Sequence, residues 1–345
     1  MSSQPFQPAV EVTRGSLVES AHAAAIAVAD PDGSLLASFG DHDRLIYLRS
    51  AAKPFQAAAA LATGIAGTYG FTQEEIALIS ASHAGEAIHA RTASSILARC
   101  GLDASALGCG THIPFSRLAA DQLVRAGQAP SVLMNNCSGK HAGMLAAAKA
   151  GGHSISTYLE PVHPVQRANL EAVSAFTGVP VSKVRMAVDG CSAPTFAVTL
   201  RETARAYARL VAAASVVTGS PALTSAAARV AAAMRACPEM ISGEGMLDTI
   251  LMRAIPGLVA KIGADGVHAM GWLGSRGPVG IAVKIMDGDS GKARAAVVLE
   301  TLRQVGAVDG SVTLPESMTG DFRVRSLRGA EVGEIKAIFT LRRPV

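Results

Sequence analysis

Residues 23–38, AAAIAVADPDGSLLAS, contain two short apolar runs separated by a turn. Apolar runs of this length that are bounded by turn-forming residues are typical of β-strands. The four residues between them, DPDG at 30–33, supply the Asp, Pro and Gly that tight turns use. This stretch therefore predicts a β-hairpin near the N-terminal end of the chain.

The last third of the chain returns to strand-like patterns, whereas the middle is rich in alanine and amphipathic. Strands are predicted at residues 258–262, 268–271, 280–285, 322–324 and 335–341, with a helix at 292–305. Helices are predicted at residues 51–62, 88–98, 118–126, 140–150, 164–176, 194–211 and 221–236. A further helix opens at the capping-box pattern of residues 72–75, and one buried strand is predicted at 184–188.

Strands at both ends with helices between them predict an α+β fold. In such a fold both ends of the chain share one antiparallel sheet, and a helical lobe is inserted between them. We expect a single two-lobed catalytic domain over residues 1–345. Its sheet lobe would cover roughly residues 10–50 and 255–345, and its helical lobe roughly residues 51–254.

The composition favours a large buried core and excludes some classes of partner. Of the 345 residues 49% are hydrophobic and only 17% are charged, so we expect part of the surface to be buried in a homo-oligomer. The net charge of +4 is mild. Arg201, Arg205 and Arg209 recur at helical spacing, which predicts a solvated helix face and no nucleic-acid-binding surface. Charged residues interrupt the most apolar stretch, residues 197–234, so we expect no membrane span.

The five cysteines are an odd number without the spacing of a disulfide framework. The segment MSSQPFQPAVEVTRG at residues 1–15 lacks the charged and then apolar pattern of a secretory signal. We therefore expect reduced thiols and a cytoplasmic location.

Ser50 and Lys53 form an S-x-x-K pair at the predicted start of a helix. Three residues is close to one helical turn, so both side chains would lie on one face. A lysine that burial keeps neutral could then take the proton of the serine hydroxyl. Alternatively, Ser50 is only an N-cap and Lys53 is a solvent-exposed lysine of the first turn.

Two further segments could complete such a site. Residues 78–85, LISASHAG, place Ser82 in a small polar loop, where it could bind a substrate or simply cap the next helix. Lys261 follows an apolar strand in the segment KIGADG at residues 261–266. A K-x-G on an edge strand beside an S-x-x-K serine is similar to the β-lactamase arrangement. The alternative for Lys261 is a solvent lysine before a turn.

Cys137, Lys140 and Cys191 are the candidate metal ligands. They lie in the segments NNCSGKH at residues 135–141 and VDGCS at residues 188–192. Two thiolates and a neutral amine or an imidazole could hold zinc with one position left for water, although lysine must first lose a proton. The alternative is a pair of buried cysteines that pack as small hydrophobic residues.

Taken together, these motifs resemble those of the class 3 L-asparaginases, the Rhizobium etli-type asparaginase II family. The shared segments are RSAAKPFQ at 49–56, SH at 82–83, NNCSGKHAGM at 135–144, VDGCSAP at 188–194 and KIGADG at 261–266. They occur in the same order, and the resemblance extends from about residue 10 to about residue 342.

The resemblance implies a fold similar to serine β-lactamases and glutaminases, a homodimer, and hydrolysis of L-asparagine to L-aspartate and ammonia. By matching motif it implies Ser50 as nucleophile with Lys53 as its base, and Ser82 with Lys261 as a second serine–lysine pair. It implies one zinc ion per chain on Cys137, Lys140 and Cys191, with a water as fourth ligand. Substrate-binding roles are implied for Arg49, Asn136, His141 and Asp189. Because two thiolates leave zinc little net charge, we expect a structural or substrate-orienting role for the ion.

Other readings stay open at this point. The chain could be another S-x-x-K amidohydrolase, either a glutaminase or a penicillin-recognising hydrolase. It could also be a non-catalytic zinc- or thiol-binding protein on the same fold. The preference between asparagine and glutamine is open, and so is the choice of nucleophile, although we favour Ser50.

Overall fold

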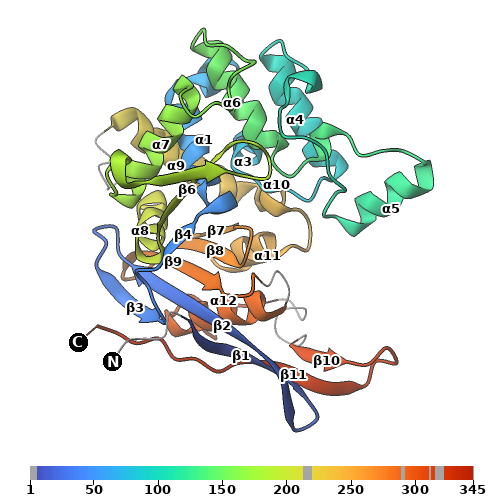
Figure 1. Ribbon diagram of the computed structural model, residues 1–345, viewed down its shortest axis with the longest axis vertical. Helices are drawn as coiled ribbons and strands as arrows, with labels where there is room; N and C mark the ends of the chain where they lie inside the picture. The colour runs from blue at the N-terminus through green and yellow to red at the C-terminus, as the bar shows by residue number, and fades with distance from the viewer. Residues whose placement is uncertain (1–5, 213–219, 289–291, 311, 315–321, 345) are drawn as a thin grey trace.

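A large antiparallel sheet and a helical lobe above it form the protein (Figure 1). The computed structural model describes residues 6–212, 220–288, 292–310, 312–314 and 322–344. In this part of the chain the large sheet has eight strands in the order β10-β11-β1-β2-β9-β8-β7, with β3 paired to β2. The strands are β1 (Gln7–Arg14), β2 (Leu17–Ala29), β3 (Leu35–Phe39), β7 (Leu258–Ile262), β8 (Val267–Gly274), β9 (Gly277–Ile285), β10 (Arg323–Arg325) and β11 (Glu331–Ala337).

Both ends of the chain meet in this sheet. Strand β1 pairs with β11 in the register Val10↔Ala337, and β2 pairs with β9 in the register Ile26↔Val283. The hairpin expected at residues 23–38 is formed by β2 and β3. All the pairings of the large sheet are antiparallel, which confirms the predicted α+β fold with a sheet built from both chain ends.

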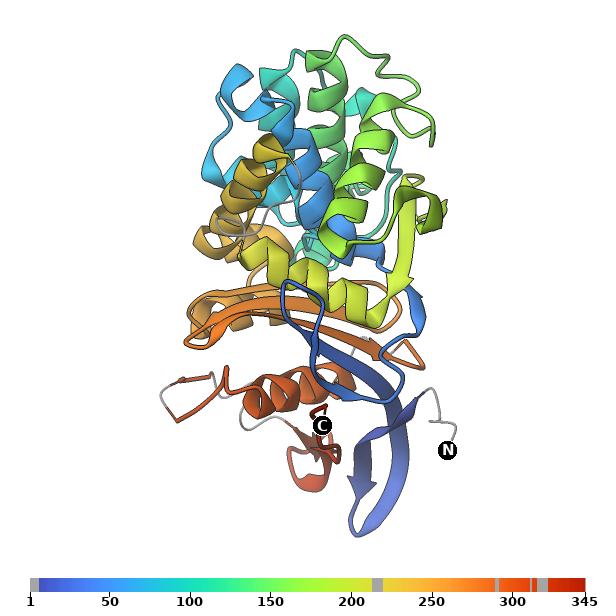
Figure 2. The same cartoon turned by 90° about the vertical axis from the view of Figure 1, so that its left-hand side faces the viewer.

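Helices from the middle of the chain make up the lobe above the sheet (Figures 1 and 2). They are α1 (Lys53–Ala62), α2 (Ile65–Thr68), α3 (Gln73–Ile79), α4 (Ala87–Arg99), α5 (Arg117–Ala126), α6 (Ser138–Ala150), α7 (Pro164–Thr177), α8 (Leu200–Val211), α9 (Pro221–Ala236), α10 (Pro238–Ser242) and α11 (Leu247–Ala254). Helix α3 begins at the predicted capping box, in which Thr72 and Glu75 bind each other's backbone N–H groups. Helix α12 (Lys292–Gln304) lies on the opposite face of the sheet from α8 (Figure 2).

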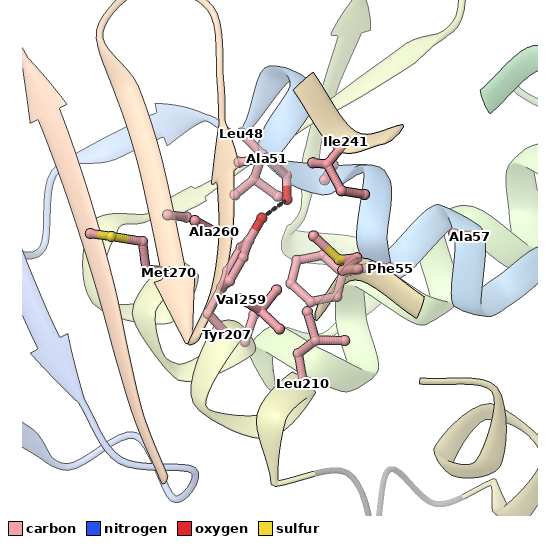
Figure 3. Packing of buried hydrophobic residues seen from close by; sticks show 14 of the residues in the cluster. Leu48, Ala51, Phe55, Ala57, Tyr207, Leu210, Ile241, Val259, Ala260 and Met270 are labelled. Carbon is pink, nitrogen blue, oxygen red and sulfur yellow. Dashed lines mark hydrogen bonds between the residues drawn. The ribbon is translucent and has the colours of Figure 1, made fainter. Parts of the chain in front are cut away.

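Two glycines allow α8 to lie close to the sheet. Gly271 on β8 and Gly280 on β9 face each other in the ladder. A Cβ atom at Gly280 would lie 1.7 Å from the carbonyl oxygen of Ala204, and one at Gly271 would lie 2.4 Å from that of Tyr207. Because both oxygens belong to the backbone of α8, any larger residue at either position would push the helix away from the strands. Tyr207 is thereby held in the core against Phe55 of α1, with ring centroids 5.3 Å apart (Figure 3).

The sequence prediction was wrong for residues 194–211. The first part of this segment is a strand, β6 (Pro194–Thr199), and α8 begins only at Leu200 after a second capping box made by Thr199 and Glu202. Strand β6 is the centre of a small sheet with β4 (Leu45–Tyr47) and β5 (Arg185–Val188). Strand β5 is mostly exposed, not buried as predicted, because it is an edge strand of this small sheet.

The arginines of α8 also differ from the prediction of a solvated face. Arg205 and Arg209 are only partly exposed, and both donate hydrogen bonds to the carbonyl oxygen of Pro31 in the hairpin turn. Arg209 also donates to the carbonyl oxygen of Ala175 at 2.7 Å. These two guanidinium groups therefore join α8 to the turn and to α7, while Arg201 remains exposed. None of the helices in the described ranges is long and apolar enough to cross a membrane.

Candidate active site

Ser50 lies in a short 3₁₀ helix, Arg49–Ala52, that leads directly into α1. Pro54 occupies the first turn of α1, where its missing N–H costs nothing because the first-turn donors have no intrahelical partner. Ser50 is partly exposed, whereas Lys53 is only 1% exposed. The alternative that Lys53 is a solvent lysine is therefore wrong.

The amine of Lys53 binds Ser82, and the sequence analysis did not predict this contact. Lys53 Nζ lies 2.7 Å from Ser82 Oγ, 2.6 Å from the carbonyl oxygen of Ala81 and 3.3 Å from that of Asn136. Among the described hydrogen bonds, none joins the hydroxyl of Ser50 to Lys53. Lys53 thus follows one serine by a helical turn and binds the other directly.

These three contacts can accommodate a neutral Lys53. A neutral amine has two N–H groups and one lone pair, and the two carbonyl oxygens can accept the two N–H groups. The hydroxyl of Ser82 can then donate to the lone pair, because a serine hydroxyl rotates to suit its partner. Burial lowers the pKa of Lys53 and outweighs the nearby thiol groups, of which Cys137 contributes most in the opposite direction. This arrangement is the one that a general base requires.

Two glycines in α6 bring the Cys137–Lys140 segment against the Ser82 loop. A Cβ atom at Gly139 would lie 2.2 Å from the carbonyl oxygen of Leu78, and one at Gly143 would lie 2.5 Å from the side chain of Ile79. Leu78 and Ile79 end helix α3, directly before the loop that carries Ser82. The backbone N–H of Ser82 is fixed separately by the carbonyl oxygen of Ile241, at 2.9 Å. The two glycines of the SGKHAG segment are therefore needed for the close packing of α6 against the end of α3, apart from any chemical role of the segment.

Cys137, Lys140 and Cys191 converge in the buried interior beside Lys53. Each is at most 5% exposed. Lys140 Nζ lies 3.0 Å from Cys191 Sγ. The interaction between the two thiols lowers the pKa of Cys137 and raises that of Cys191. In their protonated forms Lys53 and Lys140 also lower the pKa of Cys137.

The donor set fits a metal only if Lys140 takes part. In the described ranges there is no group of three or more His, Cys, Asp and Glu side chains that could hold a metal ion. Two thiols and an amine match the soft and borderline ligands that zinc accepts. Burial acts to lower the pKa of Lys140, but Cys137 and Cys191 outweigh it and raise the pKa overall. A metal ion would therefore have to displace a proton from Lys140.

Arg49 binds two carboxylates at the mouth of the site. Its Nε and Nη2 atoms both lie 2.9 Å from Asp189 Oδ1, and its Nη1 also pairs with Asp265. Among the described residues, Arg49, Ser192 and Asp265 are the ones other than glycine with a positive φ, at 50°, 69° and 53°. Such strained backbone is costly and tends to occur at functional sites. Here it is confined to Arg49, its partner Asp265, and the turn that carries Asp189.

The other predicted substrate-binding residues lie beside this cluster. His141 is fully buried and its Nδ1 is 2.6 Å from the hydroxyl of Tyr158. The same hydroxyl accepts a hydrogen bond from the backbone N–H of Gly108 at 2.7 Å. The Nε2 atom of His141 has no hydrogen-bond partner in the described structure. Asn136 donates its backbone N–H to His112 Nε2 at 3.0 Å.

Lys261 is fully buried on β7, so the alternative of a solvent lysine is wrong for it as well. Strand β7 is an edge strand of the large sheet, as expected. Lys261 Nζ donates to the carbonyl oxygen of Ile262 at 2.9 Å, and among the described hydrogen bonds it has none to Ser82. Burial lowers the pKa of Lys261 to about 7. The predicted Ser82–Lys261 pair is therefore not hydrogen-bonded here, because Lys53 occupies that position on Ser82.

Several residues around the site were missed by the sequence analysis. They are Asp265, which pairs with Arg49; Tyr158 and His112, which bind His141 and Asn136; and Asp248 and His268, which lie near Lys261. Asp265 could have been found, because it is part of the KIGADG segment. The others carry no local signal, since each reaches the site only through the packing of distant elements.

The model of the L-asparaginase II family matches residues 10–337 of the chain. The chain therefore belongs to the L-asparaginase II family. This membership confirms the resemblance. No curated protein sequence matches the chain.

Some solved structures are weakly similar. The native form of Mglu has a TM-score of 0.39 and 17% identity, with 84% of this chain and 66% of the Mglu chain covered. This chain thus spans slightly less than two thirds of that protein. A Bacillus glutaminase has a TM-score of 0.41 and 12% identity, with 82% of this chain and 91% of the glutaminase covered.

Proposed function

We propose that this protein hydrolyses L-asparagine to L-aspartate and ammonia with a serine nucleophile and a lysine base. The observation that carries the proposal is the position of Lys53. It lies one helical turn after the partly exposed Ser50, and its amine is 2.7 Å from the hydroxyl of the second serine, Ser82. Membership of the L-asparaginase II family supports the choice of an amide substrate.

In the proposed reaction, Ser50 Oγ attacks the carbon of the side-chain amide while neutral Lys53 takes the hydroxyl proton. The proton then passes through Ser82 to the departing nitrogen, which leaves as ammonia. An aspartyl ester remains on Ser50. Water, deprotonated by the same lysine, hydrolyses this ester and restores the serine. Burial of Lys53 supports its role as base because burial favours the neutral amine.

Arg49 and Asp189 supply the opposite charges that a free amino acid requires. Asparagine has an α-carboxylate and an α-ammonium group, and the guanidinium and carboxylate of this pair match them. Both side chains are partly exposed, at 27% for Arg49 and 14% for Asp189, so a small solute can reach them. We propose that Arg49 exchanges its exposed partner Asp265 for the α-carboxylate of the substrate.

We also propose one zinc ion per chain on Cys137, Lys140 and Cys191. The convergence of two thiols and one amine in a buried position supports this proposal. When bound, zinc between two thiolates would supply a structural or substrate-orienting charge more than a Lewis acid. Cys137 is the N-cap of α6 and Lys140 lies in its first turn, so the two proposed ligands are sequence neighbours of Asn136 and His141.

A homodimer in the cytoplasm is proposed as well. Large apolar side chains are exposed on and before α5, which projects from the lobe in Figure 1: Ile113, Phe115, Leu118 and Val124. Several such residues close together are more typical of an interface than of a free surface. The five cysteines are all free, which agrees with a reducing compartment.

Ammonia release from L-asparagine and L-glutamine tests the activity. We expect turnover of L-asparagine at the higher kcat/KM, and loss of turnover in Ser50→Ala. A higher kcat/KM for L-glutamine would make the protein a glutaminase instead. Release from neither amide, combined with hydrolysis of nitrocefin, would indicate a penicillin-recognising hydrolase. No hydrolysis of any of the three, with zinc still bound, would favour a non-catalytic zinc protein.

A further inference from the structure

Lys261 lies beside two other buried ionisable side chains that the proposed reaction does not use. Asp248 is 1% exposed, and His268 and Lys261 are fully buried. They come from three elements: Lys261 from β7, His268 from β8, and Asp248 from the first turn of α11. Charged side chains are rarely buried to this extent unless they are paired. The three therefore need a common explanation.

Asp248 is held at both of its oxygens. Asp248 Oδ2 accepts the backbone N–H of Ile262 at 2.8 Å, and Asp248 Oδ1 lies 3.1 Å from His268 Nε2. The second contact is a close approach of the carboxylate to the ring, and neither of its two atoms has a hydrogen-bond partner in the described structure. Ile262 and His268 are partners in the β7–β8 ladder. The carboxylate is thus anchored to both strands at the residue that follows Lys261.

Lys261 and Asp248 bind the same residue from two sides. Lys261 Nζ donates to the carbonyl oxygen of Ile262, whose N–H is bound by Asp248. The first turn of α11 is therefore fixed against the strand that carries the lysine. Burial lowers the pKa of Lys261 to about 7, and the charge of Asp248 acts in the opposite direction. Without the carboxylate of Asp248, protonated Lys261 would have no buried anion on the side of α11.

Other charged groups act on Lys261 from the elements around it. The positive charges of Lys53 on α1 and Arg294 on α12 disfavour its protonated form, whereas the thiolate of Cys137 favours it. His83, which follows Ser82, interacts with Lys261 as well. Asp248 is the carboxylate among these groups and the strongest of them in favouring the protonated lysine.

We propose that Asp248, anchored by Ile262 and His268, is a positioning residue that holds Lys261 in the site and provides the buried counter-charge for its protonated form. The proposal rests on the proposed amide hydrolysis and adds to it that the charge state of Lys261, the second lysine of the expected Ser82–Lys261 pair, affects the reaction. Asp248 touches neither the substrate nor the reacting atoms, so its effect reaches the reaction only through Lys261.

The first test is the pH profile of kcat/KM in Asp248→Asn. The asparagine side chain keeps the shape and an oxygen for the Ile262 N–H but loses the charge. We expect the rising limb of the kcat/KM profile near pH 7 to move to lower pH by about one unit or more. This is the usual size of the effect of a nearby opposite charge on a pKa. Glu244→Gln is the matched control, because it removes the same charge from an exposed residue just before α11 and should leave the profile in place. A lower rate with an unmoved profile would overturn the proposal, since a purely structural role predicts that result.

The second test is independent of activity. The titration of Lys261 can be followed by NMR with 13C-labelled lysine, the signal being assigned by its loss in Lys261→Gln. We expect a lower midpoint in Asp248→Asn than in the wild type. An unchanged midpoint would overturn the proposal, even if the enzyme were fully active. If the midpoint is lowered but the wild-type protein releases no ammonia, the coupling of Asp248 to Lys261 is supported and the proposed function is refuted.

The reciprocal measurement covers the case in which Asp248→Asn does not fold. Coupling between two ionisable groups acts equally on both. Lys261→Gln should therefore raise the pKa of Asp248, followed through its 13C carboxyl signal, above its lowered wild-type position. An Asp248 signal that titrates identically with and without Lys261 would show that the two are uncoupled.

Discussion

The hydroxyl of Tyr207 donates a hydrogen bond of 2.8 Å to the carbonyl oxygen of Ala51, the residue that follows Ser50 (Figure 3). Tyr207 is fully buried on α8, and Ala51 belongs to the 3₁₀ helix that carries the candidate nucleophile. Helix α8 rests on the large sheet through Gly271 and Gly280. This bond therefore connects the position of Ser50 to the sheet.

Tyr207→Phe should reduce both stability and turnover. The substitution removes one buried hydrogen bond and leaves the ring in place, so we expect a loss of about 1–2 kcal/mol in the free energy of unfolding. We also expect kcat to fall several-fold with little change in KM, because the turn is loosened and no substrate contact is lost. Urea unfolding and ammonia release measure the two effects. Tyr69→Phe, at a partly exposed tyrosine, is the control, and an equal loss there would contradict the assignment.

Ser50→Ala, Lys53→Ala and Ser82→Ala should each remove nearly all activity. When several groups act as one catalytic unit, removing any one of them lowers kcat about as much as removing all of them. We therefore expect losses of roughly a thousandfold or more in kcat. Ser80→Ala is the control, because the Ser80 hydroxyl bonds to the carbonyl oxygen of Ala77 instead of Lys53. If Ser50→Ala keeps more than about a tenth of kcat, Ser82 becomes the better nucleophile, as its direct contact with Lys53 would allow.

Cys137→Ser and Cys191→Ser should lower the zinc content from about one ion per chain, the ligand count of an open zinc site. Cys237→Ser is the control, since Cys237 is also buried but lies between α9 and α10. Elemental analysis of the purified proteins measures the zinc content per chain. Full zinc in both site variants would rule out the ligand assignment and leave the two cysteines as core residues.

Activity should rise with pH and level off on the alkaline side of neutral. The proposed base is a neutral lysine, and burial lowers the pKa of both Lys53 and Lys261, the latter to about 7. Below these values the lysines are protonated and cannot accept a proton. A kcat/KM profile that is flat from about pH 5.5 upward would contradict a lysine base, because the base would then already be deprotonated at that pH, as an ordinary carboxylate is.

The stability cost of burying Lys261 should decrease as the pH rises. Its pKa is about 7 in the folded protein, against about 10.4 when unfolded. Between these values the unfolded chain binds one more proton, so the free energy of unfolding increases with pH across this window. The gain of stability in Lys261→Met over the wild type should therefore shrink from about pH 7 to about pH 10. Lys149→Met, at an exposed lysine, should show no such trend, and parallel curves for both variants would refute the expectation.

The end strands and most helices could be predicted because their signals are local. The hairpin at residues 23–38 has turn-forming residues between its two apolar runs. Helix α9 and strand β7 begin and end at the predicted residues. Strand β6 could not be recognised, because five of its residues are buried in succession and a strand buried on both faces has no alternation to separate it from a helix. We predicted a helix beginning at its first residue, Pro194, because proline is common in the first turn of a helix.

The residue types of the candidate site could be predicted, but not its contacts. Lys53, Cys137 and Lys140 lie in distinctive short motifs. The contact between Lys53 and Ser82 depends on how closely α6 approaches α3, which two glycines determine through tertiary packing. Asp248 gives no sign in the sequence that it is buried, because an aspartate in a first helical turn is usually exposed.

The pairing of β1 with β11 has a consequence for how the chain folds. Glu334 donates its backbone N–H to Thr13 Oγ1 across 321 positions of sequence. Contacts this distant are slow to form, because the entropy of closing a long loop must be overcome before they contribute. During synthesis β1 has to wait as an unpaired edge until β11 has been made, and unpaired edges are prone to aggregate. Expression at low temperature, or with chaperones that shield nascent strands, should therefore raise the yield of folded protein more than substitutions in the helical lobe do.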